Sequence, residues 1–302
     1  MKKLNSGILQ LGDTMLIYLL LTVSCFIWGI SVIVIKDIIA YLPSFFLASI
    51  RLWVTTFILF ISCLKNKQPI ITRGYKNIRK ISFFLIIVNF SITYICLPHL
   101  SVGTFAICNV MNPILVLILS HNYTKIDWKF LVVGISLLVA FILNLQGSSI
   151  KELFFVGLLI ISIISCSYGM VKLRQSILEY PFFSYTLTYH FIAAIFISLL
   201  SFILEHNQTI HITNIPQNIW LNFLIFNLIG YAYIQIIQAK SIQKIGAFKT
   251  SFILSLNPLI TLFVHFFISN QFYFINLIIF SFIVTTLTFS YFIKRVSNST
   301  IK

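Results

Sequence analysis

Apolar segments long enough to cross a lipid bilayer follow one another along the whole chain. A bilayer core requires about 20 apolar residues per helix, and ten segments of the 302-residue sequence approach that length. They are residues 15–36, 43–64, 81–98, 101–120, 129–146, 153–172, 183–204, 218–238, 246–268 and 273–293. Because backbone polar groups inside a bilayer must be paired within the segment, each is expected to be an α-helix. The sequence therefore predicts an all-α polytopic membrane protein with ten transmembrane helices.

Composition excludes a soluble protein. The chain is 59% hydrophobic and 9% charged, whereas soluble domains average about 25% charged residues. The net charge of +15 is compatible with nucleic-acid binding, but the basic residues lie in short connections between apolar segments, so the expected partner is the lipid bilayer and not nucleic acid. The five cysteines all fall inside apolar segments without metal-ligand spacing. We expect no metal site, no cofactor and no disulfide framework.

Basic residues give the orientation of the chain. With the N-terminus on the cytoplasmic side, all of the 21 Lys and Arg residues except Lys36, Arg51 and Lys151 fall on that side. Cytoplasmic connections carry an excess of Lys and Arg in membrane proteins. The sequence therefore predicts that both termini are cytoplasmic, an N-in and C-in topology.

The Asn-Pro dipeptide occurs once in each half of the chain. Asn112-Pro113 and Asn257-Pro258 both lie deep inside apolar segments. A proline removes a helical hydrogen bond, and in a bilayer the freed carbonyl must find a partner or face a water-filled cavity. Matched interruptions in two halves indicate the binding site of a transporter. We therefore expect helix breaks at Pro113 and Pro258, next to a site that contains Asn112 and Asn257.

Ten helices divide into two sets of five, which we assign to residues 15–146 and 153–293 of one membrane domain, 1–302. An odd number of helices per repeat forces an inverted arrangement. The second and seventh segments each begin at a proline and reach a polar residue eight or nine positions later, Arg51 and His190. The first and sixth carry Trp28-Gly29 and Tyr168-Gly169. The shared order of these features favours two inverted five-helix repeats.

These residues carry a resemblance to a known family. Trp28-Gly29, Arg51, Pro113 and Pro258, with the repeat length and helix count, resemble the EamA-like branch of the drug/metabolite transporter superfamily. The resemblance covers about residues 15–293 and implies a transporter, not an enzyme. Family members usually carry a Glu at the loop-side end of the fourth and ninth helices, where this chain has no acid, and a Trp where it has Tyr168. The chain is therefore identified as a divergent member.

Acidic residues are scarce and lie in connections or at segment ends: Asp13, Asp37, Asp127, Glu152, Glu179 and Glu205. Ion-coupled carriers usually place a carboxylate near the middle of the membrane. Only His190 is a well-centred titratable group. A facilitator or exchanger is therefore favoured over a proton-coupled carrier.

Arg51 is the residue that costs most to place in a membrane. Three interpretations stay open at this point. The side chain extends to the outer interface, it bonds to helix-end carbonyls, or it lines a cavity and contacts an anionic group of the substrate.

Amide and aromatic side chains provide the other candidates. Asn227, Tyr231, Gln235 and Gln238 share one face of the eighth helix, and a polar face in a membrane must meet protein or water. Interhelical hydrogen bonding and cavity lining are both compatible with that face, and His190 also has a purely structural interpretation. The predicted substrate-binding residues are Trp28, Arg51, Asn89, Tyr94, Asn109, Asn112, Tyr168, His190, Tyr231, Gln235 and Asn257.

The sequence thus predicts a secondary transporter of a bacterial cytoplasmic (inner) membrane. It would move a small organic metabolite, an amino-acid-like or nucleoside-like solute, by alternating access. No catalytic motif is present in the sequence, and we expect no enzyme. The alternative is a non-transporting assembly protein or a membrane enzyme without a recognisable motif. Monomer and homodimer both stay open.

Overall fold

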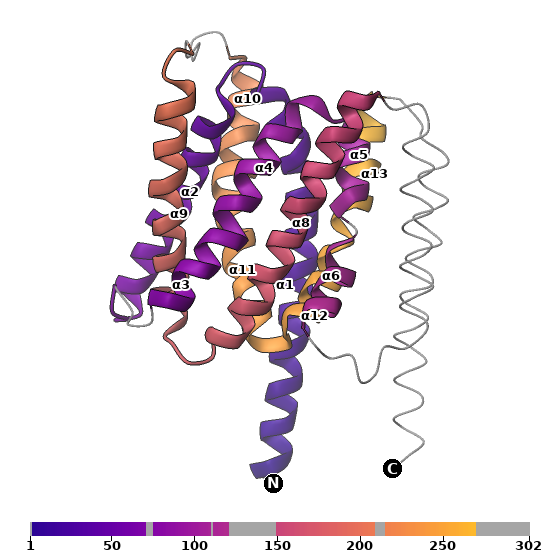
Figure 1. Cartoon of the computed structure of the whole chain (residues 1–302). Helices are drawn as coiled ribbons and strands as arrows, with labels where there is room; N and C mark the ends of the chain where they lie inside the picture. The colour runs from indigo at the N-terminus through magenta and orange to yellow at the C-terminus, as the bar shows by residue number, and fades with distance from the viewer. Residues whose placement is uncertain (1, 71–74, 110, 121–148, 209–214, 270–302) are drawn as a thin grey trace.

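The computed structural model describes residues 2–70, 75–109, 111–120, 149–208 and 215–269. Every regular element in these ranges is a helix, and the helices pack into one bundle (Figure 1). Seven helical stretches are long and apolar enough to cross a membrane. They are Thr14–Ile38, Ser44–Lys65, Asn77–His99, Val102–Leu119, Ile150–Ser176, Phe182–Glu205 and Gln217–Ile245. The predicted all-helical, multi-pass class is confirmed.

Two shorter helices, α12 (Ala247–Leu254) and α13 (Asn257–Ser269), occupy the predicted segment 246–268. The predicted segments 129–146 and 273–293 lie outside the described residues. The number of ten helices and the two complete repeats therefore stay predictions.

Four long helices are continuous: α1 (Lys2–Ile38), α2 (Ser44–Lys65), α8 (Ile150–Ser176) and α9 (Phe182–Glu205). Pro43 precedes α2 and Pro181 precedes α9, and a proline disfavours helical conformation in the residue before it. The start of α8 is fixed differently, by a capping box in which Ser149 and Glu152 satisfy each other's backbone N–H groups. Local sequence thus sets these three helix starts.

The third and eighth helices both change from α to π and back to α. The third contains α3 (Tyr75–Ile81), η1 (Ser82–Val88), α4 (Asn89–Cys96) and a final turn, η2 (Leu97–His99). The eighth contains α10 (Gln217–Asn222), η5 (Phe223–Ile229) and α11 (Gly230–Ile245). Each π-helical segment has seven residues. Such segments are rare and often occur at functional sites.

The fourth and ninth helices are interrupted directly before their Asn-Pro dipeptides. The fourth divides into α5 (Val102–Asn109) and α6 (Asn112–Leu119), as the ninth divides into α12 and α13. Near the first break the Met111 N–H donates to the Cys108 carbonyl at 3.1 Å, and near the second the Leu256 N–H donates to the Ile253 carbonyl at 3.0 Å. Both breaks are therefore turns with local hydrogen bonds.

Helices α2 and α9 lie side by side and cap each other (Figure 1). The N–H groups of Phe45 and Phe46, at the start of α2, each donate to a Glu205 carboxylate oxygen at 2.8 Å. The N–H groups of Phe183 and Ser184, at the start of α9, donate to Gln68 Oε1 at 2.9 and 3.2 Å. The first N–H groups of a helix have no intrahelical partner. Glu205, the last residue of α9, thus caps the start of α2, and Gln68, three residues after the end of α2, caps the start of α9. The two helices are therefore antiparallel.

The helix packing around α1 corresponds to the helix packing around α8, with the two halves of the chain exchanged. Helix α1 packs against α11 of the eighth helix and α13 of the ninth, while α8 packs against α4 of the third and α6 of the fourth. Glycines permit the closest approaches: a Cβ on Gly29 would lie 3.0 Å from the Thr261 nitrogen, and a Cβ on Gly169 would lie 2.7 Å from Leu85 Cα. Gly29 thus approaches the ninth helix and Gly169 the third, so both aromatic-Gly pairs lie at close helix contacts, although the contacted helices are not counterparts.

Basic side chains gather at one end of the bundle. Figure 1 shows the N-terminus on the same side as the ends of α2, α8 and α11 and the starts of α3 and α12. These positions carry Lys65, Arg79, Lys80, Lys172, Arg174, Lys240, Lys244 and Lys249. The side that the sequence assigns to the cytoplasm is thus one continuous end of the fold.

Candidate binding site

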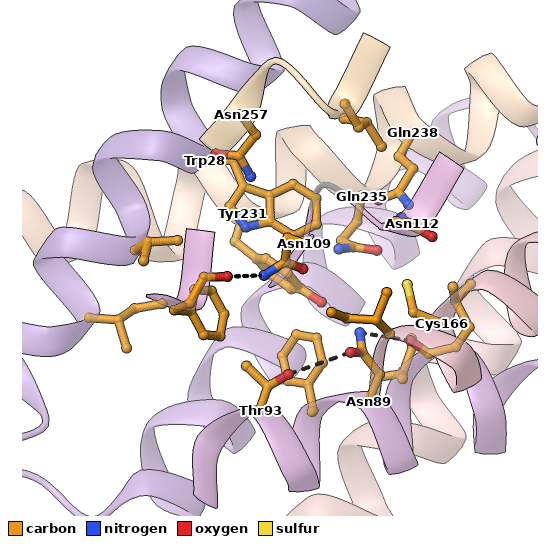
Figure 2. Close-up of a pocket in the computed structure, with 18 of the residues that line it drawn as sticks. Trp28, Asn89, Thr93, Asn109, Asn112, Cys166, Tyr231, Gln235, Gln238 and Asn257 are labelled. Carbon is orange, nitrogen blue, oxygen red and sulfur yellow. Dashed lines mark hydrogen bonds between the residues drawn. The ribbon is translucent and has the colours of Figure 1, made fainter. Parts of the chain in front are cut away.

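A cavity of about 100 Å³ lies inside the bundle. It is enclosed by α1, α2, the third helix, both parts of the fourth, α8, α11 and both parts of the ninth. Figure 2 shows amide and aromatic side chains from both halves directed into it. A water needs about 10–15 Å³ of such space, so the cavity has room for several waters or one small organic solute.

Both helix breaks face this cavity. Asn109 and Asn112 flank the break of the fourth helix, and Ser255 and Asn257 flank the break of the ninth; all four line the cavity. The Asn109 amide donates to the Phe105 carbonyl at 2.8 Å (Figure 2), and Asn257 accepts from the Thr261 hydroxyl at 3.2 Å. The prolines 113 and 258 are buried and occupy the second positions of α6 and α13. The paired interruptions therefore meet at one site.

Serines of α8 hold two of the cavity amides. The Ser162 hydroxyl donates to Asn89 Oδ1 at 2.7 Å, and the Ser167 hydroxyl donates to Asn112 Oδ1 at 2.6 Å. Because the amide oxygens are engaged, the side chains are fixed in orientation. These asparagines therefore both form interhelical hydrogen bonds and line the cavity.

Arg51 is 5% exposed and lines the cavity from α2. Its Nη1 donates to Tyr94 Oη at 2.6 Å, its Nε to the Asn227 carbonyl at 3.3 Å, and its Nη2 to Ser31 Oγ at 3.5 Å. The guanidinium carbon also lies 4.2 Å from the centre of the Tyr231 ring. The side chain is thus held inside the bundle and does not extend to the outer interface.

The polar face of the eighth helix divides between the cavity and the packing behind it. Tyr231, Gln235 and Gln238 line the cavity (Figure 2). Asn227 is fully buried and accepts a hydrogen bond from the Ser31 hydroxyl at 2.7 Å. The π-helical segment η5 therefore contacts α1 through the Asn227 side chain and Arg51 through the Asn227 backbone carbonyl.

Nine of the predicted substrate-binding residues line the cavity: Trp28, Arg51, Asn89, Tyr94, Asn109, Asn112, Tyr231, Gln235 and Asn257. Tyr168 and His190 do not. Tyr168 packs edge-on against Phe84, with ring centres 4.9 Å apart. The His190 ring is fully buried, and its Nδ1 lies 2.9 Å from the Thr186 carbonyl. His190 follows its proline by one residue more than Arg51 does, and one residue rotates a helix position by about 100°.

Several lining residues were missed in the sequence: Phe90, Thr93, Cys166, Ser251 and Ser255. Thr93 follows Asn89 by four positions, so helical spacing from a recognised polar residue identifies it. Ser251 and Ser255 are four positions apart, a polar repeat on one helical face that was not used. Phe90 and Cys166 carry no such signal, because an apolar residue in an apolar helix resembles its neighbours.

Charge in the cavity is one-sided. Among the described residues Arg51 is the one charged side chain of the lining. Glu205 and Glu152 cap helices elsewhere, and Asp37 and Glu179 lie at or just beyond the ends of α1 and α8. Within the described residues no group of three or more His, Cys, Asp or Glu could hold a metal ion.

Comparison with protein families matches residues 15–146 to the EamA-like transporter family. The matched residues coincide with those assigned to the first five-helix repeat. No curated protein matches the chain. The resemblance carried by Trp28-Gly29, Arg51 and Pro113 is thus confirmed.

Proposed function

From the membership of residues 15–146 in the EamA-like transporter family, we propose that this multi-pass membrane protein is a secondary transporter of a small organic solute. The observation that carries the proposal is the central cavity, which both interrupted helices face and both halves of the chain line. Broken helices around a central site are typical of secondary transporters.

Four paired features support an inverted-repeat architecture. They are the reciprocal caps of α2 and α9, the π-helical segments η1 and η5, the two helix breaks, and the exchanged packing of α1 and α8. Each relates a helix of the first half to its counterpart in the second. Two related halves can rock against each other around a fixed site, which is the basis of alternating access.

Two contacts at opposite ends of the bundle supply candidate gates. At the end of α1 the Lys36 ammonium donates to the Leu100 carbonyl, which defines the outer gate. At the end of α8 Arg174 donates to the Ile242 carbonyl at 3.0 Å and to the Gln243 carbonyl, which defines the inner gate. The outer gate joins α1 to the connection that follows the third helix, and the inner gate joins α8 to α11 of the eighth helix. Opening the cavity toward one end requires release of the gate at that end.

The cavity chemistry favours facilitated transport or exchange over proton coupling. The described lining holds no carboxylate, and His190, the candidate proton carrier, lies outside the lining. The basic end of the bundle suits the cytoplasmic face of a bacterial inner membrane, with both termini inside. Monomer and homodimer are both compatible with this mechanism.

Counterflow in proteoliposomes tests the function. Vesicles are loaded with an unlabelled metabolite mixture and receive the labelled mixture outside, without any ion gradient. We expect transient accumulation of at least one solute, slower in Gln235→Ala and unchanged in Phe202→Ala, whose side chain is 76% exposed on the outside of the bundle. Absence of counterflow for every solute would favour the non-transporting alternative. Accumulation driven by an imposed pH gradient would contradict the facilitator mechanism.

A further inference from the structure

We propose that the cavity is a monoanion site, in which the carboxylate of a small organic acid binds Arg51, Tyr94 and Tyr231. This inference rests on the proposed transport function for its biological purpose. The binding site itself stands on the contacts of these three residues and is testable without transport.

The first argument is the unbalanced charge of Arg51. A buried guanidinium is costly unless an anion or several hydrogen bonds offset it. Arg51 contacts a phenol, a backbone carbonyl and a hydroxyl, all of them neutral. Of the described carboxylates, Glu205 is the one that is buried, and its two oxygens accept from the N–H groups of Phe45 and Phe46, six and five residues before Arg51 on α2. The positive charge therefore lacks a protein counterion within the described residues.

Hydrogen-bond donors of Arg51 remain available. A guanidinium carries five N–H groups, one on Nε and two on each terminal nitrogen. One N–H of each nitrogen is used, by the Asn227 carbonyl, Tyr94 and Ser31. One N–H on Nη1 and one on Nη2 are left. Two N–H groups on the terminal nitrogens are what a carboxylate needs for bidentate binding.

Two tyrosine hydroxyls add further donors at the same place. Tyr94 Oη accepts its hydrogen bond from Arg51, so its own proton can be donated to another group. Tyr231 is 3% exposed and its hydroxyl is buried without a hydrogen-bond partner. A buried polar atom without a partner is uncommon in native structures. Both side chains line the cavity, so a solute oxygen placed there would satisfy them.

The surroundings strengthen the attraction. The guanidinium carbon lies 5.9 Å from the Phe90 ring centre and 4.2 Å from that of Tyr231. These rings exclude water from the cation, and electrostatic attraction increases as the local dielectric constant falls. The cavity is therefore arranged to bind an anion more strongly than an exposed arginine would.

The other polar side chains of the lining are neutral. Asn109, Gln235, Gln238 and Asn257 present amides to the cavity (Figure 2). Amides can bond a hydroxyl, an amide or an amine of the solute, but they do not balance a second full charge. One arginine balances one negative charge, so the favoured solute is a monocarboxylate, not a cation or a phosphate dianion. This narrows the amino-acid-like or nucleoside-like class to small acids.

Matched ligands test the charge requirement on the full-length protein in detergent. Small monocarboxylates of up to about ten non-hydrogen atoms, within the room for several waters, are compared with their primary amides and corresponding amines. Phosphate monoesters form a separate arm. The readout is the melting temperature, because a ligand that binds only the folded state stabilises it. We expect at least one carboxylate to raise it while its amide and amine do not.

Variants then locate the site. Arg51→Gln is expected to raise the Kd of that carboxylate at least tenfold, and Tyr231→Phe severalfold, while His190→Gln leaves it unchanged. Tyr231→Phe removes only a hydroxyl that has no partner, so it keeps the test valid if Arg51→Gln does not fold. Stronger binding by neutral, cationic or phosphorylated solutes, or no binding by any carboxylate, would overturn the proposal. So would carboxylate binding that survives both substitutions.

Transport is measured separately on the same protein. Carboxylate binding without counterflow would leave the anion site in place and contradict the transport function. Counterflow of a neutral or cationic solute, with no carboxylate bound, would support the transport function and contradict the anion site. The two proposals can therefore fail independently.

Discussion

Helices α2 and α9 are alike at their ends and different in their middles. Each begins after a proline and receives its cap from the opposite end of the other, Glu205 for α2 and Gln68 for α9. In the middle, Arg51 lines the cavity, whereas His190 bonds to the Thr186 carbonyl of its own helix. The caps of the two helices thus correspond, whereas α2 contributes a charged side chain to the cavity lining and α9 contributes none. A solute with a single charged group would consequently bind in one orientation only.

The largest expected effect tests that asymmetry directly. Arg51→Gln should weaken the apparent affinity for a transported carboxylate by about 100-fold, because losing one partner of a buried charge interaction costs about 2–5 kcal/mol. His190→Gln should change it by less than about threefold, since an ordinary hydrogen bond contributes about 1 kcal/mol and this ring lies outside the cavity. Dose-dependent counterflow measures both. A larger loss in the His190 variant would reverse the assignment of the two helices.

Helix approach at Gly169 gives the next largest effect, this time on stability. Gly169→Ala places a Cβ 2.7 Å from Leu85 Cα, and overpacking of this kind costs about 1–3 kcal/mol. Gly29→Ala should cost less, because its nearest contact is the Ile260 side chain at 2.9 Å. Gly157→Ala, with no atom within 4 Å of the added Cβ, is the control. We expect the melting temperature to be highest for Gly157→Ala, lower for Gly29→Ala and lowest for Gly169→Ala.

The two caps should differ in strength although they occupy corresponding places. Glu205→Ala leaves two N–H groups without their carboxylate and should cost about 2 kcal/mol, since hydrogen bonds to charged groups are worth about 1.5–3 kcal/mol. Gln68→Ala removes a neutral cap and should cost about 1 kcal/mol. Chemical or thermal unfolding measures both. Equal losses would indicate that the carboxylate charge contributes nothing at the start of α2.

The smallest expected effect concerns the gates. Cys166 lines the cavity and serves as a reporter when the other four cysteines are replaced. Arg174→Met should increase its labelling from the inner side, and Lys36→Met from the outer side. Each change should be about fivefold, which corresponds to about 1 kcal/mol for one hydrogen bond lost. Membrane-impermeant thiol reagents applied to oriented vesicles give the rates. Increased labelling from both sides in either variant would contradict separate gates.

Features that depend on local sequence were predictable. Hydropathy located the described helices, and the Asn-Pro dipeptides located both breaks, because a proline acts on its own turn. Helical spacing brought Tyr231 and Gln235 to the cavity. Arg51 was recognised, but its Tyr94 and Asn227 contacts depend on how three helices pack.

Other features required the fold. The Glu205 cap joins residues 160 positions apart, and no local pattern announces it. His190 was predicted at the cavity as the one well-centred titratable group, beside a purely structural interpretation. It lies one residue further from its proline than Arg51 does, which rotates its position on the helix by about 100°. The π-helical segments also carry no recognisable composition in SFFLIIV and FLIFNLI.

The segment η5 sets the angular position of everything that follows it on the eighth helix. A π-helix closes its hydrogen bonds one residue later than an α-helix does. Deleting one residue from Phe223–Ile229 would therefore rotate Gly230–Ile245 by about 100°. Tyr231 would leave the guanidinium of Arg51, and Gln235 and Gln238 would leave the cavity. Changes in the length of this segment would thus alter solute selectivity in one step, whereas substitutions along the same face would alter it gradually.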